Sequence, residues 1–76
     1  MTTDIESLFT PTEAKQMRRR AQSFANLAYA AEQQWRDPSG FRDQHMDHMI
    51  RICQKHGLTE DEIWATIQQV REEEAA

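Results

Sequence analysis

Residues 11–36, PTEAKQMRRRAQSFANLAYAAEQQWR, decide the fold of this chain. Small and apolar residues recur along the stretch in alternating steps of three and four, at Ala14, Met17, Ala21, Phe24, Ala28, Ala31 and Trp35. Because an α-helix has about 3.6 residues per turn, this spacing keeps all seven on one side of a helix. The stretch therefore predicts one long amphipathic helix over residues 11–36.

The sequence TPTE at residues 10–13 marks where this helix begins. Thr10 and Glu13 have the spacing of a capping box, in which each side chain binds the backbone N–H of the other residue. Pro11 occupies the first helical position, where its missing N–H is not needed. Phe9 is placed to pack on Ala14 as a hydrophobic staple. Upstream, Ile5, Leu8 and Phe9 predict a short helical turn over residues 4–9.

Two shorter helices are expected after the break at residues 37–40, DPSG. The first covers residues 39–56 and ends at Gly57, which suits a left-handed cap. The second covers residues 60–73 and begins with a capping box from Thr59 to Glu62, with Leu58 as a staple on Ile63. Glutamates at 72–74 lie at the unfavourable end of the helix dipole, so residues 72–76 are expected to fray.

The chain as a whole is predicted to be all-α, a small helical bundle forming a single domain over residues 1–76. No alternating strand pattern and no repeat occurs in its 76 residues. Cys53 is the only cysteine, which excludes an internal disulfide and suits a reducing compartment. The run after the three arginines at 18–20 is too polar for a signal peptide or membrane span, so we expect a cytoplasmic protein.

A homodimer is expected because the long helix exceeds its neighbours in length. It measures roughly 38 Å at 1.5 Å per residue, and neither shorter helix can cover it. Uncovered aromatic and apolar side chains on a small chain typically mark an interface. The residues expected there are Phe24, Leu27, Tyr29, Trp35 and Trp64. The alanine-rich centre of the helix would admit a second backbone, although a bend near residues 23–26 would instead let the chain close on itself.

Four residues could form a metal site: His45, His48, Cys53 and His56. Spacings of three or four along a helix let two side chains reach one ion, and imidazole with thiolate favours zinc or copper. However, Cys53 lies on an apolar face with Met46 and Met49, while the histidines lie on the neighbouring face. The alternative is that these histidines are packing residues, and no cofactor is required.

Lys15, Arg18, Arg19 and Arg20 form the only basic cluster. They could contact an anion, an acidic partner or a phosphate backbone. The alternative is a solvated face that pairs with the acidic last helix. The net charge of −4 argues against general affinity for DNA.

The corner around Gly57 also has the spacing of a DNA-binding helix-turn-helix, with a small residue at Cys53 and an aliphatic one at Ile63. Any tight corner between two helices requires that spacing. The acidic start of the last helix would repel phosphates, so we do not expect nucleic acid as a partner.

Catalysis has little support in the sequence. No nucleophile, histidine and acid occur in a recognised order, and the two glycines form no phosphate loop. Cys53 should be buried and inert. The expected function is therefore a small non-enzymatic protein–protein interaction module, a regulator, adaptor or inhibitor. A metal-binding sensor and a nucleic-acid-associated regulator that uses Lys15 to Arg20 remain the two alternatives.

Overall fold

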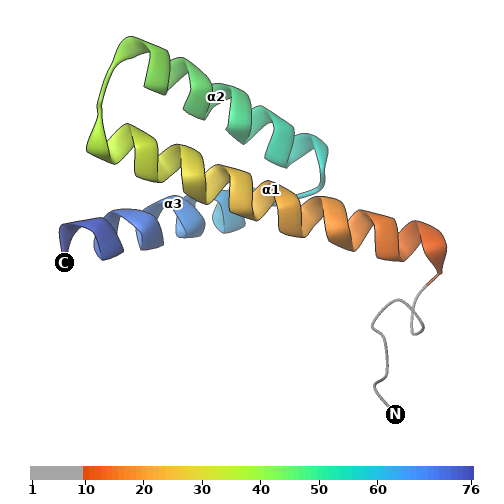
Figure 1. Cartoon of the computed structure of the whole chain (residues 1–76). Coiled ribbons are helices and arrows are strands. Elements are labelled where there is room, and N and C mark those ends of the chain that lie inside the picture. The colour runs from red at the N-terminus through yellow and green to blue at the C-terminus, as the bar shows by residue number, and fades with distance from the viewer. Residues whose placement is uncertain (1–9) are drawn as a thin grey trace.

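The computed structural model describes residues 10–76, which form three α-helices joined by two short connections (Figure 1). Helix α1 spans Pro11–Arg36, α2 spans Gly40–Lys55 and α3 spans Glu60–Ala75. No strand occurs between residues 10 and 76. The all-α prediction and the bounds of the long helix are confirmed. The turn expected at residues 4–9 and the staple from Phe9 lie outside the described residues.

The predicted capping boxes are present at both helices that carry them. The backbone N–H of Glu13 donates to the Thr10 hydroxyl at 3.2 Å, and that of Glu62 donates to the Thr59 hydroxyl at the same distance. Ser39 caps α2 in a simpler way, its hydroxyl accepting from the backbone N–H of Arg42 at 3.1 Å. Each helix therefore begins where a side chain replaces a missing backbone partner.

Gly57 makes the turn between α2 and α3 possible. Its φ is +86°, a left-handed conformation that side chains with a Cβ disfavour. The N–H of Leu58 reaches the Cys53 carbonyl at 3.0 Å, and the N–H of Gly57 reaches the Gln54 carbonyl at 3.1 Å. This pair of bonds is the Schellman motif, and it confirms the predicted glycine cap.

Helix α1 is the element on which the other two pack. α2 runs back along α1, and α3 then runs in the same direction as α1 on another side of it (Figure 1). Each of them contacts α1 far more extensively than they contact each other. Residues 11–19 of α1 extend past the turn between α2 and α3 (Figure 1). We call these residues together with the cap residue Thr10 (residues 10–19) the arm, and the rest of the described chain the body.

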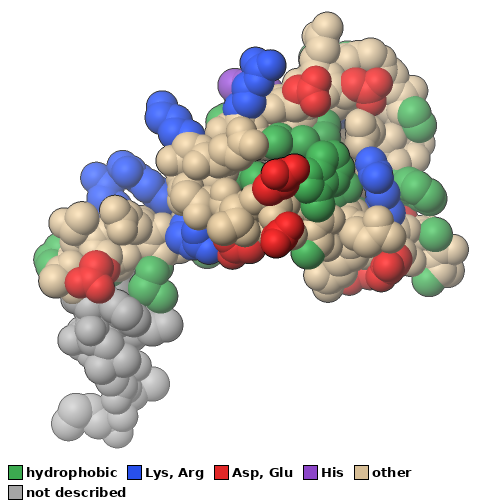
Figure 2. Space-filling view, turned by 180° about the vertical axis from the view of Figure 1, so that it is seen from behind, with side chains coloured by type: hydrophobic (Ala, Val, Ile, Leu, Met, Phe, Trp, Pro, Cys, Tyr) green, Lys and Arg blue, Asp and Glu red, His purple; other side chains and the backbone are tan. Residues whose placement is uncertain are grey.

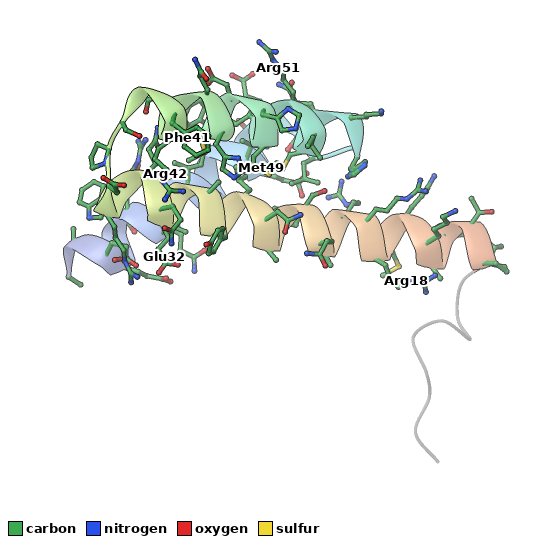
Figure 3. All side chains as sticks on the ribbon, turned by 45° about the horizontal axis from the view of Figure 1, so that its top comes forward. Arg18, Glu32, Phe41, Arg42, Met49 and Arg51 are labelled. Atoms are coloured by element: carbon green, nitrogen blue, oxygen red, sulfur yellow. The ribbon has the colours of Figure 1, made fainter. Side chains whose placement is uncertain are left out.

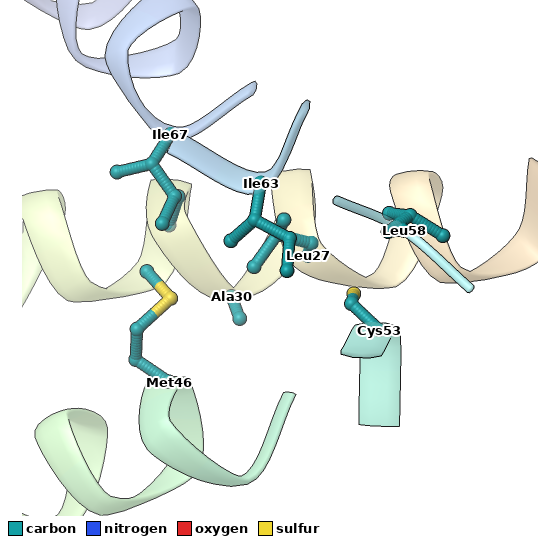
Figure 4. Close-up of a cluster of buried hydrophobic side chains, with 8 residues drawn as sticks. Leu27, Ala30, Met46, Cys53, Leu58, Ile63 and Ile67 are labelled. Atoms are coloured by element: carbon teal, nitrogen blue, oxygen red, sulfur yellow. The ribbon is translucent and has the colours of Figure 1, made fainter. Parts of the chain in front are cut away.

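The core lies where the three helices of the body meet (Figure 4). It contains Leu27, Ala30 and Ala31 from α1, Met46 and Cys53 from α2, Leu58 from the turn, and Ile63 and Ile67 from α3. The two alanines bring the α1 backbone close to its neighbours. The alanine-rich centre of α1 therefore serves, at Ala30 and Ala31, the packing of this chain on itself.

Helix α3 continues beyond its predicted end at residue 73, to Ala75. The carboxylate of Glu74 accepts two bonds from the Arg36 guanidinium, at 3.0 and 3.1 Å. Gln68 and Gln69 donate side-chain bonds to the glutamates four residues later. These contacts offset the unfavourable dipole, while fraying of residues 72–76 stays a prediction. Within the described residues, no helix is long and apolar enough to cross a membrane.

Candidate functional site

The aromatic residues expected at an interface divide into exposed and packed ones. Tyr29, Trp35 and Trp64 are 59%, 45% and 49% exposed, as the sequence led us to expect. Phe24 is half-buried against the core. Leu27 is fully buried at its centre, so its expected exposure is wrong. The reason is that α2 and α3 cover the stripe through Leu27 and Ala30, adjacent to the stripe that the sequence spacing emphasised.

The exposed side chains do not form one continuous surface. Residue 29 follows Leu27 by two positions, or about 200° around the helix, so Tyr29 lies opposite the core. Trp35 lies at the other end of α1 from the arm, beside the connection to α2. Phe41, at the start of α2, is 70% exposed, with the Arg42 guanidinium 5.8 Å from the centre of its ring (Figure 3). The most exposed aromatic residue between positions 10 and 76 was therefore not among the predicted interface residues.

A cleft of about 430 Å³ opens beside Trp35. Its walls are Gln34, Trp35, Pro38, Asp43 and Arg71, from all three helices and the first connection. The amide of Gln34 donates to the Asp43 carboxylate at 2.8 Å and holds that wall in place. Arg71 is half-buried, yet no acid between residues 10 and 76 forms an ion pair with it. The cleft thus combines an aromatic face with two charged groups, the Asp43 carboxylate bound to Gln34 and an Arg71 guanidinium that has no ion-pair partner among residues 10–76.

The basic cluster is divided between two roles. Arg20 donates through Nη1 to the Gly57 carbonyl and through Nη2 to the Glu62 carboxylate, the latter at 2.7 Å. It therefore ties α1 to the turn and to α3, which is the pairing with the acidic helix that we considered as an alternative. Lys15, Arg18 and Arg19 remain exposed on the arm. Figure 2 shows Lys and Arg side chains along the upper edge of the arm and over the adjoining end of the body.

A second cavity, of about 370 Å³, lies where the arm meets the end of α2. It is lined by Gln16, Arg19, Arg20, Lys55, His56 and Gly57. Lys55 was not part of the predicted cluster, because it is 36 positions from Arg19 and only the folded chain brings them to one cavity. No acidic side chain lines this cavity among the residues that the structure describes.

The four residues considered for metal binding do not converge. Across residues 10–76, no three His, Cys, Asp or Glu side chains are placed to hold one ion. Cys53 is 1% exposed, and its thiol lies 3.5 Å from the Ser23 carbonyl. His48 is exposed to solvent on α2. The alternative of packing or surface histidines therefore describes this geometry better.

A hydrogen bond between the buried Ser23 and the half-buried His56 is a contact that sequence reasoning missed. Ser23 Oγ lies 2.8 Å from His56 Nδ1, although the two residues are 33 positions apart. Ser23 is only 2% exposed, so its hydroxyl cannot reach a substrate from solvent. The pair instead links α1 to the end of α2 and satisfies a buried hydroxyl. In the sequence, the only indication of this hydrogen bond was the position of Ser23, a polar residue on the side of α1 that is buried.

Among the ionisable groups of the body, Cys53 and Glu62 have pKa values shifted by their surroundings in opposite chemical senses. Burial raises the pKa of the Cys53 thiol, because the thiolate would lose its hydration. The pKa of the Glu62 carboxyl is lowered, mainly by the hydrogen bond from the Thr59 backbone N–H, with the Thr59 hydroxyl and Arg20 adding to it and burial opposing. The thiol is thus kept unreactive, while the carboxylate is kept charged.

Comparison with protein-family models, with curated proteins and with solved structures finds no match to this chain.

Proposed function

We propose that this protein is a non-enzymatic protein–protein interaction module of the cytoplasm, and that its binding surface is the cleft beside Trp35. The observation that supports this most directly is that one concave site holds a 45% exposed tryptophan and a half-buried Arg71 that forms no ion pair with an acid among residues 10–76. Tryptophan and arginine, together with tyrosine, are the residues most enriched at interaction hot spots. A partner that fills the cleft meets an apolar ring and a cation together.

The energetic argument rests on the area that Trp35 leaves exposed. Burial of the remaining part of the ring, on the order of 100 Å², would contribute roughly 2.5 kcal/mol at 25 cal/mol per Å². A carboxylate of the partner that bonds with Arg71 would form a charge-assisted pair, shielded by the walls of the cleft. The partner that fits is a protein segment with an apolar side chain next to an acid.

Self-association is the form of binding that we propose to test first. The chain carries 13 acidic residues, many of them on α3, so a second copy can supply the carboxylate as well as the apolar side chain. The dimer would then use the Trp35 end of the body. The exposed face of α1 at Ala21 and Ala25 is a poorer site, because small side chains contribute little buried area.

Tryptophan fluorescence provides a direct test, because Trp35 and Trp64 are the only tryptophans. Replacing Trp64 with Phe leaves Trp35 as the single reporter, and the converse variant leaves Trp64. As the protein concentration is raised from micromolar to millimolar, we expect the Trp35 emission to shift to the blue because association buries the ring. The sedimentation coefficient should rise over the same range. The Trp64 emission serves as the internal comparison.

Variants at the cleft make the test specific. Trp35→Ala and Arg71→Gln should each weaken self-association about tenfold or more, as expected for hot-spot residues. Tyr29→Ala is the matched control, since Tyr29 is also exposed but lies on the opposite side of α1. A protein that stays monomeric at millimolar concentration excludes self-association. Association that is lost equally in the Tyr29 variant excludes the cleft.

A further inference from the structure

We propose that the cavity between the arm and the end of α2 binds a phosphate group. This site is separate from the cleft beside Trp35, since the two lie at opposite ends of α2. Its walls carry three cationic side chains, Arg19, Arg20 and Lys55, and no acid among the described residues. The chain has a net charge of −4, whereas the charged side chains that line this cavity are all basic. The charge of the cavity is therefore opposite to that of the molecule as a whole.

Arg19 and Lys55 are the residues that would bind the anion. Neither forms a hydrogen bond or ion pair with any residue in the range 10–76, although the chain holds more acids than bases. Arg20 differs, because its guanidinium is already bound to Glu62 and to the Gly57 carbonyl. Two cations that face one cavity repel each other, and an anion placed between them removes that repulsion.

The remaining walls are held in position by contacts within the body. Arg20 fixes the turn at Gly57, and the Ser23 hydroxyl fixes the ring of His56 at 2.8 Å from Nδ1. This leaves the other ring nitrogen, Nε2, without a protein partner in the described chain. Gln16 adds a neutral amide from α1. These walls therefore need little rearrangement when the site fills, and the side chains that must become ordered are those of Arg19 and Lys55.

Size and electrostatics together favour phosphate as the ligand group. A volume of about 370 Å³ falls in the range of small-molecule sites, roughly 300–1,000 Å³. The C-terminal end of α2 would by itself disfavour an anion. The Gly57 carbonyl at that end, however, accepts from Arg20, and the two unpaired cations exceed the partial charge of the helix end. A doubly charged phosphate matches two cations, and arginine binds it through two parallel N–H groups.

The test is a titration of the ¹⁵N-labelled full chain with inorganic phosphate, at constant ionic strength maintained with sodium chloride. The proposal expects saturable shifts confined to the backbone amides of residues 16–20 and 55–57. Arg19→Gln and Lys55→Gln should each weaken binding roughly tenfold, the effect of a hydrogen bond to a charged group. Neither variant should change the melting temperature, because neither side chain has a partner in the described protein.

Arg51→Gln is the matched control, since Arg51 lies on α2 and points away from α1 (Figure 3). It removes the same charge and should leave phosphate binding unchanged. Shifts that do not saturate, or that spread over the whole surface, would overturn the proposal. So would a loss of phosphate affinity in Arg51→Gln as large as that in Arg19→Gln and Lys55→Gln. A parallel titration with O-phosphoserine distinguishes the source: tighter binding identifies a phosphate ester, and equal binding identifies the free ion. Neither result depends on the cleft beside Trp35.

Discussion

The arm and the body contain parts of the same helix, but different interactions hold them. In residues 20–36, α1 buries Ser23, Leu27, Ala30 and Ala31 against its neighbours. In the arm, Ala14 is the only buried residue. The capping box of the arm is also looser than that of the body. The backbone nitrogen of Thr10 lies 3.4 Å from the Glu13 carboxylate, whereas that of Thr59 lies 2.9 Å from the Glu62 carboxylate.

The difference shows that helix formation and helix packing have separate causes in this chain. Ala14, Met17 and Ala21 follow the same apolar spacing as the later part of α1. However, α2 and α3 do not cover Met17 or Ala21. Local signals therefore set the length of α1, while tertiary contacts decide which part of it is stable. Four experiments test this division, in order of decreasing expected change in stability.

Leu27→Ala should have the largest effect, because Leu27 is fully buried where the three helices meet. Removal of a buried leucine side chain lowers the free energy of unfolding by about 3 kcal/mol or more. The measurement is urea denaturation followed by circular dichroism. Tyr29→Ala on the same helix should change stability by less than about 0.5 kcal/mol. Equal effects of the two variants would mean that Leu27 is not in the core.

Gly57→Ala should destabilise the body by about 1 to 2 kcal/mol, because Ala would have to adopt the left-handed conformation. Crowding is not the cause, since a Cβ there would lie 3.6 Å from the nearest atom, Nη1 of Arg20. Gly40→Ala is the control at an open helix start, and it should raise stability by up to about 1 kcal/mol. If both variants changed stability in the same direction, the assignment of the turn would be wrong.

The two threonine caps should give effects of similar size but in different places. Thr59→Ala should lower global stability by about 1 kcal/mol, because α3 belongs to the body. Thr10→Ala removes a similar bond from the arm, which can open while the body stays folded. Hydrogen exchange should therefore accelerate in residues 13–19 with little change in the melting temperature. A drop in melting temperature equal to that of Thr59→Ala would show that the arm and body unfold together.

Acidification should produce the smallest effect, through Glu62. Because its pKa in the folded chain is lowered from the ordinary 4.5, the unfolded chain binds the proton first as pH falls. The contribution of Glu62 is therefore complete above pH 4.5 and is lost below it, as pH approaches the folded value. Glu62→Gln should flatten that part of the melting profile between pH 6 and pH 3.

The helices could be predicted well from the sequence because the interactions that begin and end them join residues close together in the chain. Thr10, Thr59 and Gly57 act on backbone groups within a few residues, so spacing alone identifies them. The burial of Leu27 could not be predicted in the same way. It depends on which of two adjacent stripes of α1 is covered, and that is decided by the positions of α2 and α3.

The candidate sites were predictable only in part for the same reason. Arg19 and Arg20 were recognised as basic, and Trp35 as exposed. Lys55 lies 36 residues after Arg19, and Arg71 lies 36 residues after Trp35. The link between Ser23 and His56 likewise spans 33 positions and leaves no periodic signal. Pattern reasoning identifies the members of such sites singly, and only the packed helices assemble them.

The sparse contact between α2 and α3 has a consequence for how the chain unfolds. Each of these helices is anchored on α1, so communication between them passes through α1, the core and the short turn at Gly57. Cooperativity in this protein is therefore carried by a single shared element. Loss of order in residues 20–36 releases both partners at once, whereas detachment of α3 leaves α1 and α2 as a helical hairpin.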